Sequence, residues 1–186
     1  MGVRAIIGQQ VTVKAATTLA RRFVAKLGEP YATPFPELAR LTPTPERVAE
    51  AQVDDIASLG IVGARARSII ALAQAHVSGA LSLEHRVHHS PTEIIARLAE
   101  LPGIGQWTAH YIAMRALRWP DAFPKEDIAV RNCLGGVSAK QAEELSQPWR
   151  PWRSYAVLHL WRASGATPPA PSGAPDSRDT PAPAAR

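Results

Sequence analysis

A glycine-rich turn set between two helical patterns constrains this chain more than any other stretch. The turn reads Leu101-Pro102-Gly103-Ile104-Gly105. The sequence before it, beginning Ser90-Pro91, is typical of a helix start, with Ser90 as N-cap and proline at the first helical position. After it, apolar residues recur at three- and four-residue spacing from residue 107 to residue 116. The sequence therefore predicts two amphipathic helices joined by a glycine hairpin.

Such a hairpin has a chemical consequence at the start of its second helix. The first backbone N–H groups of a helix have no partner within it, and the helix dipole adds positive potential there. Glycines at positions 103 and 105 permit unusual φ angles and let another backbone approach closely. The expected ligand of this turn is a phosphate group.

The hairpin pattern, with Asp127 about twenty residues after it, resembles the helix-hairpin-helix/Gly-Pro-Asp (HhH-GPD) DNA glycosylases. The likeness is greatest to the DNA-3-methyladenine glycosylase II, or AlkA, type. Residues Val3–Val11 resemble the opening helix of that family and Trp149–Trp161 its closing helix, so the resemblance covers most of residues 2–163. It implies an all-α, two-lobed fold with the active-site cleft between the lobes.

The resemblance places the family's essential aspartate at Asp127. In that role the carboxylate would stabilise the oxocarbenium-like sugar as the N-glycosidic bond breaks, and position or deprotonate the attacking water. A second interpretation is that Asp127 is the N-cap of a helix over 128–134, a position that Asp often fills. Both can hold together, because a helix N-terminus favours a carboxylate anion.

Three aromatic residues match the positions that line the base pocket of AlkA-type enzymes: Trp107, Tyr111 and Trp161. A purine methylated at a ring nitrogen is cationic, and aromatic faces attract cations. The alternative is ordinary core packing, since aromatic residues at i and i+4 usually point inward. Such a base is also a good leaving group, so one carboxylate can suffice.

The expected partner is double-stranded DNA containing alkylated bases, and the damaged base must leave the duplex to be cleaved. The resemblance assigns the side chain that fills the resulting gap to Gln10, where AlkA carries an apolar residue. Gly103, Ile104, Gly105 and Thr108 are the candidate DNA-binding residues of the hairpin. The family often binds a monovalent cation through hairpin carbonyls, which here would be those of Leu101 and Ile104. We expect no side-chain metal site and no cofactor.

Lysine placement indicates a monofunctional enzyme. Glycosylases that also cleave the DNA backbone carry a Schiff-base lysine on the hairpin helix, where this chain has Trp107. The lysines of the chain lie elsewhere, at Lys14, Lys26, Lys125 and Lys140. We therefore expect no lyase activity at abasic sites, with Lys125, two residues from Asp127, as the one reservation.

Charge and cysteine content agree with this class of protein. The net charge of +5 is compatible with nucleic acid binding, although many basic proteins bind none. The single cysteine, Cys133, cannot supply the four thiolates of the iron–sulfur cluster that some related glycosylases carry. The sequence has neither a bilayer-spanning run nor a signal peptide, and we expect a soluble, monomeric protein of the bacterial cytoplasm acting at the nucleoid.

The resemblance implies a glycosylase domain over 1–163, with lobes at about 2–119 and 120–163, and the composition predicts a disordered Pro/Ala-rich tail over 164–186. A first helix over 3–27 has no cap, so we expect a truncation that removes the β-rich domain of AlkA-type enzymes. Further helices are expected at 45–51 and 138–146, with Thr44 and Ser138 as their N-caps, and at 54–59, 64–78 (with Val77 inward) and 148–164. A second glycine turn at 59–63 is expected to serve packing, and His85, His88 and His89 to form a solvated loop.

Two other functions fit the same sequence. One is an inactive helix-hairpin-helix DNA-binding module left by a truncated gene. The other is a glycosylase of different base specificity, acting on mismatched or oxidised bases. Arg150 and Arg153, which lie beside Trp149 and Trp152, would contact the DNA backbone or stack on tryptophan at the surface.

Overall fold

The structure describes residues 1–83 and 90–165, in which helices are joined by loops. In this computed structural model, ten α-helices and two short 3₁₀ helices follow one another along those residues. A single bridge between Pro30 and Arg40 is the only strand-like pairing within them. The predicted all-α fold is confirmed.

Six of these elements come before residues 84–89 in the chain and six come after them. Before this segment the chain forms α1 (Gly2–Ile7), α2 (Val13–Leu27), η1 (Pro36–Leu38), α3 (Pro45–Ala49), α4 (Val53–Ala57) and α5 (Gly63–Val77). After it come α6 (Pro91–Glu100), α7 (Gln106–Arg115), α8 (Ile128–Cys133), α9 (Ala139–Leu145), η2 (Gln147–Trp149) and α10 (Arg153–Ala163). The predicted N-caps Thr44 and Ser138 accept hydrogen bonds from the first turns of α3 and α9, and Ser90 forms a capping box with Glu93 on α6.

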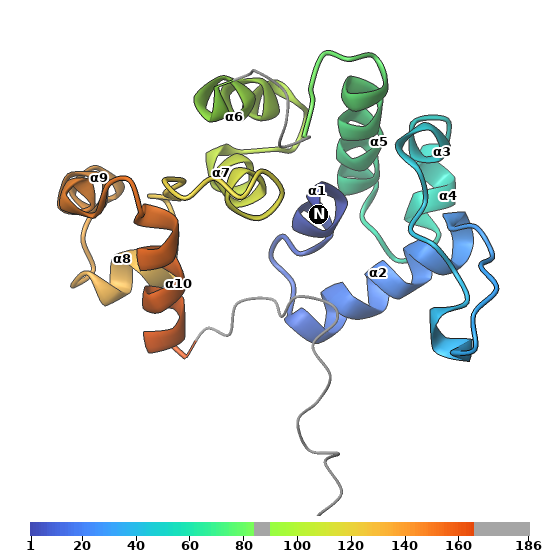
Figure 1. The fold of residues 1–186 in the computed structure, drawn as a ribbon, viewed down its shortest axis with the longest axis horizontal. Helices are drawn as coiled ribbons and strands as arrows, with labels where there is room; N and C mark the ends of the chain where they lie inside the picture. Colours follow the sequence, from blue (N-terminus) through green and yellow to red (C-terminus); the bar gives the residue numbers. More distant parts are fainter. Residues whose placement is uncertain (84–89, 166–186) are drawn as a thin grey trace, which may run out of the picture.

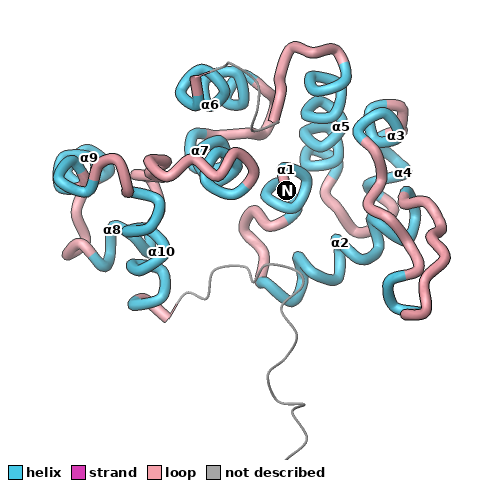
Figure 2. The backbone as a smooth tube through the Cα atoms, viewed as in Figure 1, coloured by secondary structure: helices cyan, strands magenta, loops and turns pink. Residues whose placement is uncertain are grey.

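Helix α1 lies at the centre of the arrangement and packs against α2, α5 and α7 (Figure 1). Helices α3 and α4 cover α5 on one side, whereas α8, α9 and α10 gather on the other, beyond α7. The loop segments that join these helices are visible in Figure 2. The hairpin helix α7 therefore lies between the two groups.

One continuous core joins the two groups of helices. Its fully buried members include Ile6 of α1, Ile69 of α5 and Ile112 of α7. Phe123 and Val157 extend the same cluster toward α8 and α10. Burial of this apolar surface is what positions α7 against the C-terminal helices.

The predicted first helix over 3–27 is wrong in its continuity, because the chain breaks between α1 and α2. Gly8 ends α1, and its N–H donates to the Arg4 carbonyl. Gln10 has a φ of 53°, which no right-handed helix accommodates. Thr12 then restarts the helix, with its side chain accepting a hydrogen bond from Ala15 N–H. A cap inside the periodic pattern decides the break.

The last helix begins five residues later than predicted, at Arg153 and not at Pro148. Arg150 precedes Pro151 and is extended, with ψ of 142°, because the proline ring disfavours helical conformation in the residue before it. The prediction that Val77 points inward is also wrong, since this last residue of α5 is exposed. The helix ends at the surface there, so apolar spacing overstated its buried length.

Some predictions fall outside the described residues, namely the loop with His85, His88 and His89 and the tail from residue 166 onward. Within the described ranges, no helix has the length and apolar character required to cross a bilayer.

Candidate active site

The glycine hairpin forms between α6 and α7 as predicted. Gly103 has a φ of 73°, the left-handed region that favours glycine. A Cβ atom at this position would collide with the Ser68 side-chain oxygen on α5, so the turn can approach α5 only without one. Ile104 is buried and its N–H donates to the Leu101 carbonyl at 3.1 Å, which closes the turn. The sequence around Gly103 thus fixes where α7 begins.

The start of α7 offers unpaired backbone donors. Gly105 is the N-cap, and the first hydrogen bond of the helix runs from Ala109 N–H to its carbonyl at 3.0 Å. The amides of residues 106–108 precede that bond and have no acceptor within the helix. No atom lies within 4 Å of the position that a Cβ on Gly105 would occupy. This open, positively polarised turn is suited to a phosphate.

Asp127 accepts two hydrogen bonds that fix both of its carboxylate oxygens. It is the N-cap of α8, and Val130 N–H donates to Oδ1 at 2.9 Å. The Trp107 indole Nε1–H donates to Oδ2 at 2.7 Å. The residue is only 8% exposed. The cap predicted for Asp127 is confirmed, and the second bond ties the C-terminal helices to the hairpin helix.

The three aromatic residues of the prediction lie together beside this carboxylate. The rings of Trp107 and Tyr111 stack with centroids 5.3 Å apart and 14° between their planes. Tyr111 and Trp161 are tilted by 41° at 6.1 Å. Tyr111 and Trp161 are buried, and Trp107 is half-buried. A base could not enter between the stacked pair, so the available surface is the outer side of the cluster.

Burial shifts the proton equilibria of two side chains of α7. It raises the pKa of the Tyr111 phenol above its ordinary value of 10.0, which keeps the ring neutral. It lowers the pKa of His110 below 6.5, while the nearby Glu126 carboxylate acts in the opposite direction. His110 Nδ1 and Glu126 Oε2 are buried without a hydrogen-bond partner among the described residues. The hydrogen bonds of the Asp127 carboxylate among the described residues come from Trp107 and Val130, and not from His110 or Glu126.

Asp121, Arg153 and Glu143 form a structural network of charged side chains. Asp121 is buried and accepts two hydrogen bonds from the Arg153 guanidinium, at 2.7 and 2.9 Å. Arg153 also donates to Glu143 at 2.9 Å and lies over the Phe123 ring. The prediction that Arg153 contacts DNA or stacks at the surface is therefore wrong, because its side chain is 4% exposed.

Two further cations lie at the edge of this network. Arg150 is exposed and lies 3.6 Å from Asp121. Lys125 lies 3.7 Å from Glu143, directed to that carboxylate.

The loop that carries Gln10 is hydrogen-bonded to the hairpin by Gln9, a residue that the sequence did not single out. Gln10 is exposed in the loop between α1 and α2. Its neighbour Gln9 donates from Nε2 to the Gly103 carbonyl at 3.1 Å and to the Thr108 hydroxyl at 2.9 Å. Thr108 is buried, so its side chain supports the turn and only its backbone amide is left for a phosphate. Three consecutive residues without apolar character, Gly8 to Gln10, were the available signal inside the predicted helix.

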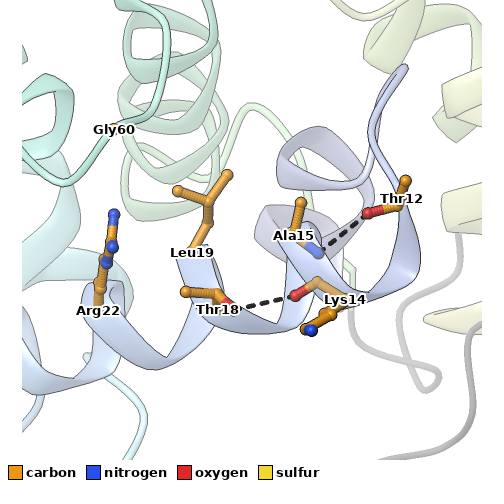
Figure 3. A pocket seen from close by; sticks show the side chains of 7 residues that line it. All are labelled: Thr12, Lys14, Ala15, Thr18, Leu19, Arg22 and Gly60. Atoms are coloured by element: carbon orange, nitrogen blue, oxygen red, sulfur yellow. Dashed lines mark hydrogen bonds between the residues drawn. The ribbon is translucent and has the colours of Figure 1, made fainter.

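The second glycine turn lies on α2, away from Asp127. Gly60 has a φ of 90°, and Arg22 Nη1–H donates to the neighbouring Leu59 carbonyl at 3.1 Å. A pocket of about 480 Å³ borders this turn (Figure 3). Its walls are Thr12, Lys14, Ala15, Thr18, Leu19, Arg22 and Gly60, none of which contributes to the Asp127 cluster.

Possible cation ligands are few in the described part of the chain. No group of three or more His, Cys, Asp or Glu residues is arranged to hold a metal there. Of the two hairpin carbonyls considered for a monovalent cation, that of Leu101 already accepts the Ile104 N–H. The cation stays a prediction.

Comparison with known proteins gives a consistent picture. Residues 3–151 match the family model described as HhH-GPD superfamily base excision DNA repair protein. The chain is 37% identical over 167 residues to DNA-3-methyladenine glycosylase 2 of Escherichia coli, covering 90% of this chain and 58% of that protein. It is 40% identical over 163 residues to a probable bifunctional transcriptional activator/DNA repair enzyme AlkA of Mycobacterium tuberculosis, covering 86% and 32%. The chain thus spans between about a third and three fifths of these relatives.

Solved structures share the fold. The 3-methyladenine DNA glycosylase of Schizosaccharomyces pombe in complex with abasic DNA has a TM-score of 0.72 and 25% identity, over 88% of this chain and 79% of that one. The Clostridium acetobutylicum 8-oxoguanine glycosylase/lyase in complex with double-stranded DNA has a TM-score of 0.74 at 18% identity, over 88% and 58%. The second likeness concerns the fold alone.

Proposed function

Because the chain belongs to the HhH-GPD superfamily of base excision DNA repair proteins, we propose that it is a monofunctional DNA glycosylase that releases alkylated purines from duplex DNA. Its residues 1–163 would form the glycosylase domain. The lobe over about 2–119 would supply the hairpin, Trp107 and Tyr111, and the lobe over about 120–163 the Asp127 carboxylate and Trp161. The relatives named as 3-methyladenine glycosylases support the substrate class.

The observation that carries this proposal is the hydrogen bond between Trp107 and Asp127. It holds a largely buried carboxylate against an aromatic cluster, at 2.7 Å from the indole nitrogen. With both oxygens fixed, the carboxylate is preorganised and needs no reorganisation as positive charge develops on the sugar. An ordinary N-cap would require the Val130 bond alone.

Substrate chemistry agrees with this site. A purine methylated at a ring nitrogen carries positive charge, which the outer side of the aromatic cluster of Trp107, Tyr111 and Trp161 would attract. The charge makes the base a good leaving group, so the C–N bond can break without a strong general acid. Asp127 would stabilise the oxocarbenium-like sugar. Water then adds to the sugar carbon from which the base has left, and its proton passes to the carboxylate. The products are the free base and an abasic site.

The remaining predicted residues would hold the DNA. The amides of Gly105 and of the first turn of α7 bind a phosphate of the damaged strand, which fixes position without reading sequence. Gln10 fills the gap left by the extruded base and hydrogen-bonds to the base that remains. No step of this mechanism depends on a cation at the hairpin carbonyls.

Absence of lyase activity is part of the same proposal. Lys125 lies 3.7 Å from the Glu143 carboxylate, and the hairpin helix carries no lysine. Without an amine at the sugar, no Schiff base can form. Borohydride should therefore trap no covalent adduct with methylated or abasic DNA, and a trapped adduct would contradict the monofunctional assignment.

The test is excision of 3-methyladenine or 7-methylguanine from methylated duplex DNA by the wild-type chain and by Asp127→Asn. We expect the variant to lose activity while still binding DNA. Asp127→Asn keeps an oxygen for one of the two donors but presents its NH₂ to the other, so folding should be verified by melting temperature. Binding without excision by the wild type would instead indicate a DNA-binding module. Excision of oxidised or mismatched bases in place of alkylated ones would indicate the other specificity.

A further inference from the structure

The side chain of Gln9 joins two parts of the molecule that are distant in sequence. Its Nε2 group donates to the Gly103 carbonyl and to the Thr108 hydroxyl, 94 and 99 residues further along the chain. A primary amide has two N–H groups, so both bonds are made at the same time. Gln9 lies in the loop between α1 and α2, and both acceptors belong to the hairpin.

The two acceptors lie on either side of the N-cap of α7. Gly103 is in the turn itself, in its left-handed conformation, whereas Thr108 is in the first turn of the helix. Gly103 cannot move toward α5, because Ser68 already occupies that side. Thr108 is 4% exposed, so its hydroxyl has little access to water as a substitute donor. The Gln9 amide therefore fixes the turn relative to the helix whose amides face the phosphate.

Gln10 follows directly and takes a conformation that an isolated chain would avoid. Its φ of 53° is uncommon for a residue other than glycine or asparagine. Such a conformation persists only where the surroundings impose it. Gln9 is anchored on one side, and Thr12 caps α2 on the other. The exposed Gln10 side chain is consequently presented at a fixed place relative to the hairpin.

We propose that Gln9 is a positioning residue that couples insertion by Gln10 to the phosphate grip of the hairpin. The proposal rests on the proposed function only in taking DNA as the ligand. A phosphate bound at the start of α7 fixes the DNA strand at a set distance from Gln10. The Gln10 side chain then lies where the extruded base leaves a gap in the base stack. Without Gln9 the hairpin still binds a phosphate, but Gln10 enters the duplex less often.

The experiment uses the full chain and a duplex with a tetrahydrofuran abasic analogue opposite 2-aminopurine. Anisotropy measures binding, and 2-aminopurine fluorescence measures the change in stacking when a side chain enters the gap. No bond is cleaved, so the result is independent of whether the chain excises alkylated bases. The variants are Gln9→Ala, Gln10→Ala and the double substitution. Gln74→Ala is the matched control, because Gln74 donates one side-chain hydrogen bond to a backbone carbonyl, that of Ala49, in a distant part of the fold.

We expect Gln9→Ala to reduce, by roughly tenfold, the population of bound duplex in which a side chain has entered the gap, as measured by 2-aminopurine fluorescence. This factor is the equivalent of about one net hydrogen bond. Binding to undamaged duplex should change less than twofold. In the Gln10→Ala background the Gln9 substitution should have no further effect on fluorescence, because the residue it positions is absent. An equal loss in both backgrounds, or an equal loss in Gln74→Ala, would overturn the proposal.

Thr108 provides a second route if Gln9→Ala fails to fold. Thr108→Val removes one of the two acceptors while keeping the shape of the buried side chain. It should lower the fluorescence change by a few fold, and Thr108→Ser should restore most of it, because the oxygen returns. A Thr108→Val protein with the full wild-type fluorescence change would contradict the coupling.

Discussion

The hydrogen bond from Trp107 to Asp127 can be removed with little other change by Trp107→Phe. Phenylalanine retains an aromatic ring that can stack on Tyr111, from which the indole is now 5.3 Å distant, but it has no N–H. Asp127 would keep the Val130 N–H on Oδ1 and lose its donor on Oδ2. Since the carboxylate is 8% exposed, water can replace the lost donor only in part.

The size of the effect follows from the kind of bond. A hydrogen bond to a charged group contributes about 1.5–3 kcal/mol. Because the indole is half-buried, we take a value near the lower end and expect a loss of about 2 kcal/mol in the free energy of unfolding. For a chain of this size that corresponds to a fall of about 4–8 °C in melting temperature. If the same bond orients the carboxylate in the transition state, 2 kcal/mol is about a thirtyfold loss in single-turnover excision rate.

The matched control is Trp152→Phe. Trp152 is 58% exposed and packs edge-on against Tyr155, so the same substitution there removes no hydrogen bond to a carboxylate. Calorimetry and single-turnover excision of 7-methylguanine should separate the two variants clearly. If Trp107→Phe matches Trp152→Phe in both melting temperature and rate, the preorganised carboxylate is not what the site depends on.

Three further predictions concern the surroundings of the site. Gly103→Ala should lower the melting temperature and abolish duplex binding, because φ at this position is 73° and the Ser68 side chain occupies the place of the Cβ atom. Gly105→Ala has open space around its Cβ atom, so it should weaken duplex binding without loss of stability. Equal melting temperatures for the two variants would contradict this prediction. Arg153→Met should cost about 3–5 kcal/mol by leaving Asp121 buried without its bidentate partner, measured by denaturant unfolding. The exposed Arg150→Met should change stability by less than about 1 kcal/mol. Finally, burial lowers the pKa of His110, so as pH falls below 6.5 the unfolded chain takes up this proton before the folded chain does. The stability of the folded chain should therefore decline as pH falls through that range. His110→Gln should flatten the decline in melting temperature recorded between about pH 5 and 8, on either side of the ordinary pKa.

Local chemistry made much of the fold predictable. The turn around Gly103, the caps at Thr44, Ser90 and Ser138, and the N-cap role of Asp127 each depend on a few neighbouring residues, and all are found in the structure. The helix break at Gln10 was missed because apolar periodicity continued through it. The late start of α10 was missed although Pro151 indicated it, since the residue before a proline avoids helical conformation.

The sequence by itself determined the hairpin, the all-α class and the residue types available to the site, because periodicity, caps and glycine positions act over a few residues. Only the tertiary structure decided which side chains meet. Trp107 and Asp127 are twenty residues apart, and Gln9 is 94 residues from Gly103, yet both pairs form hydrogen bonds. It also directed Arg153 into a buried pair with Asp121 and away from solvent. Such pairings follow from burying one shared core, whose geometry depends on all the helices together and is not contained in any single segment.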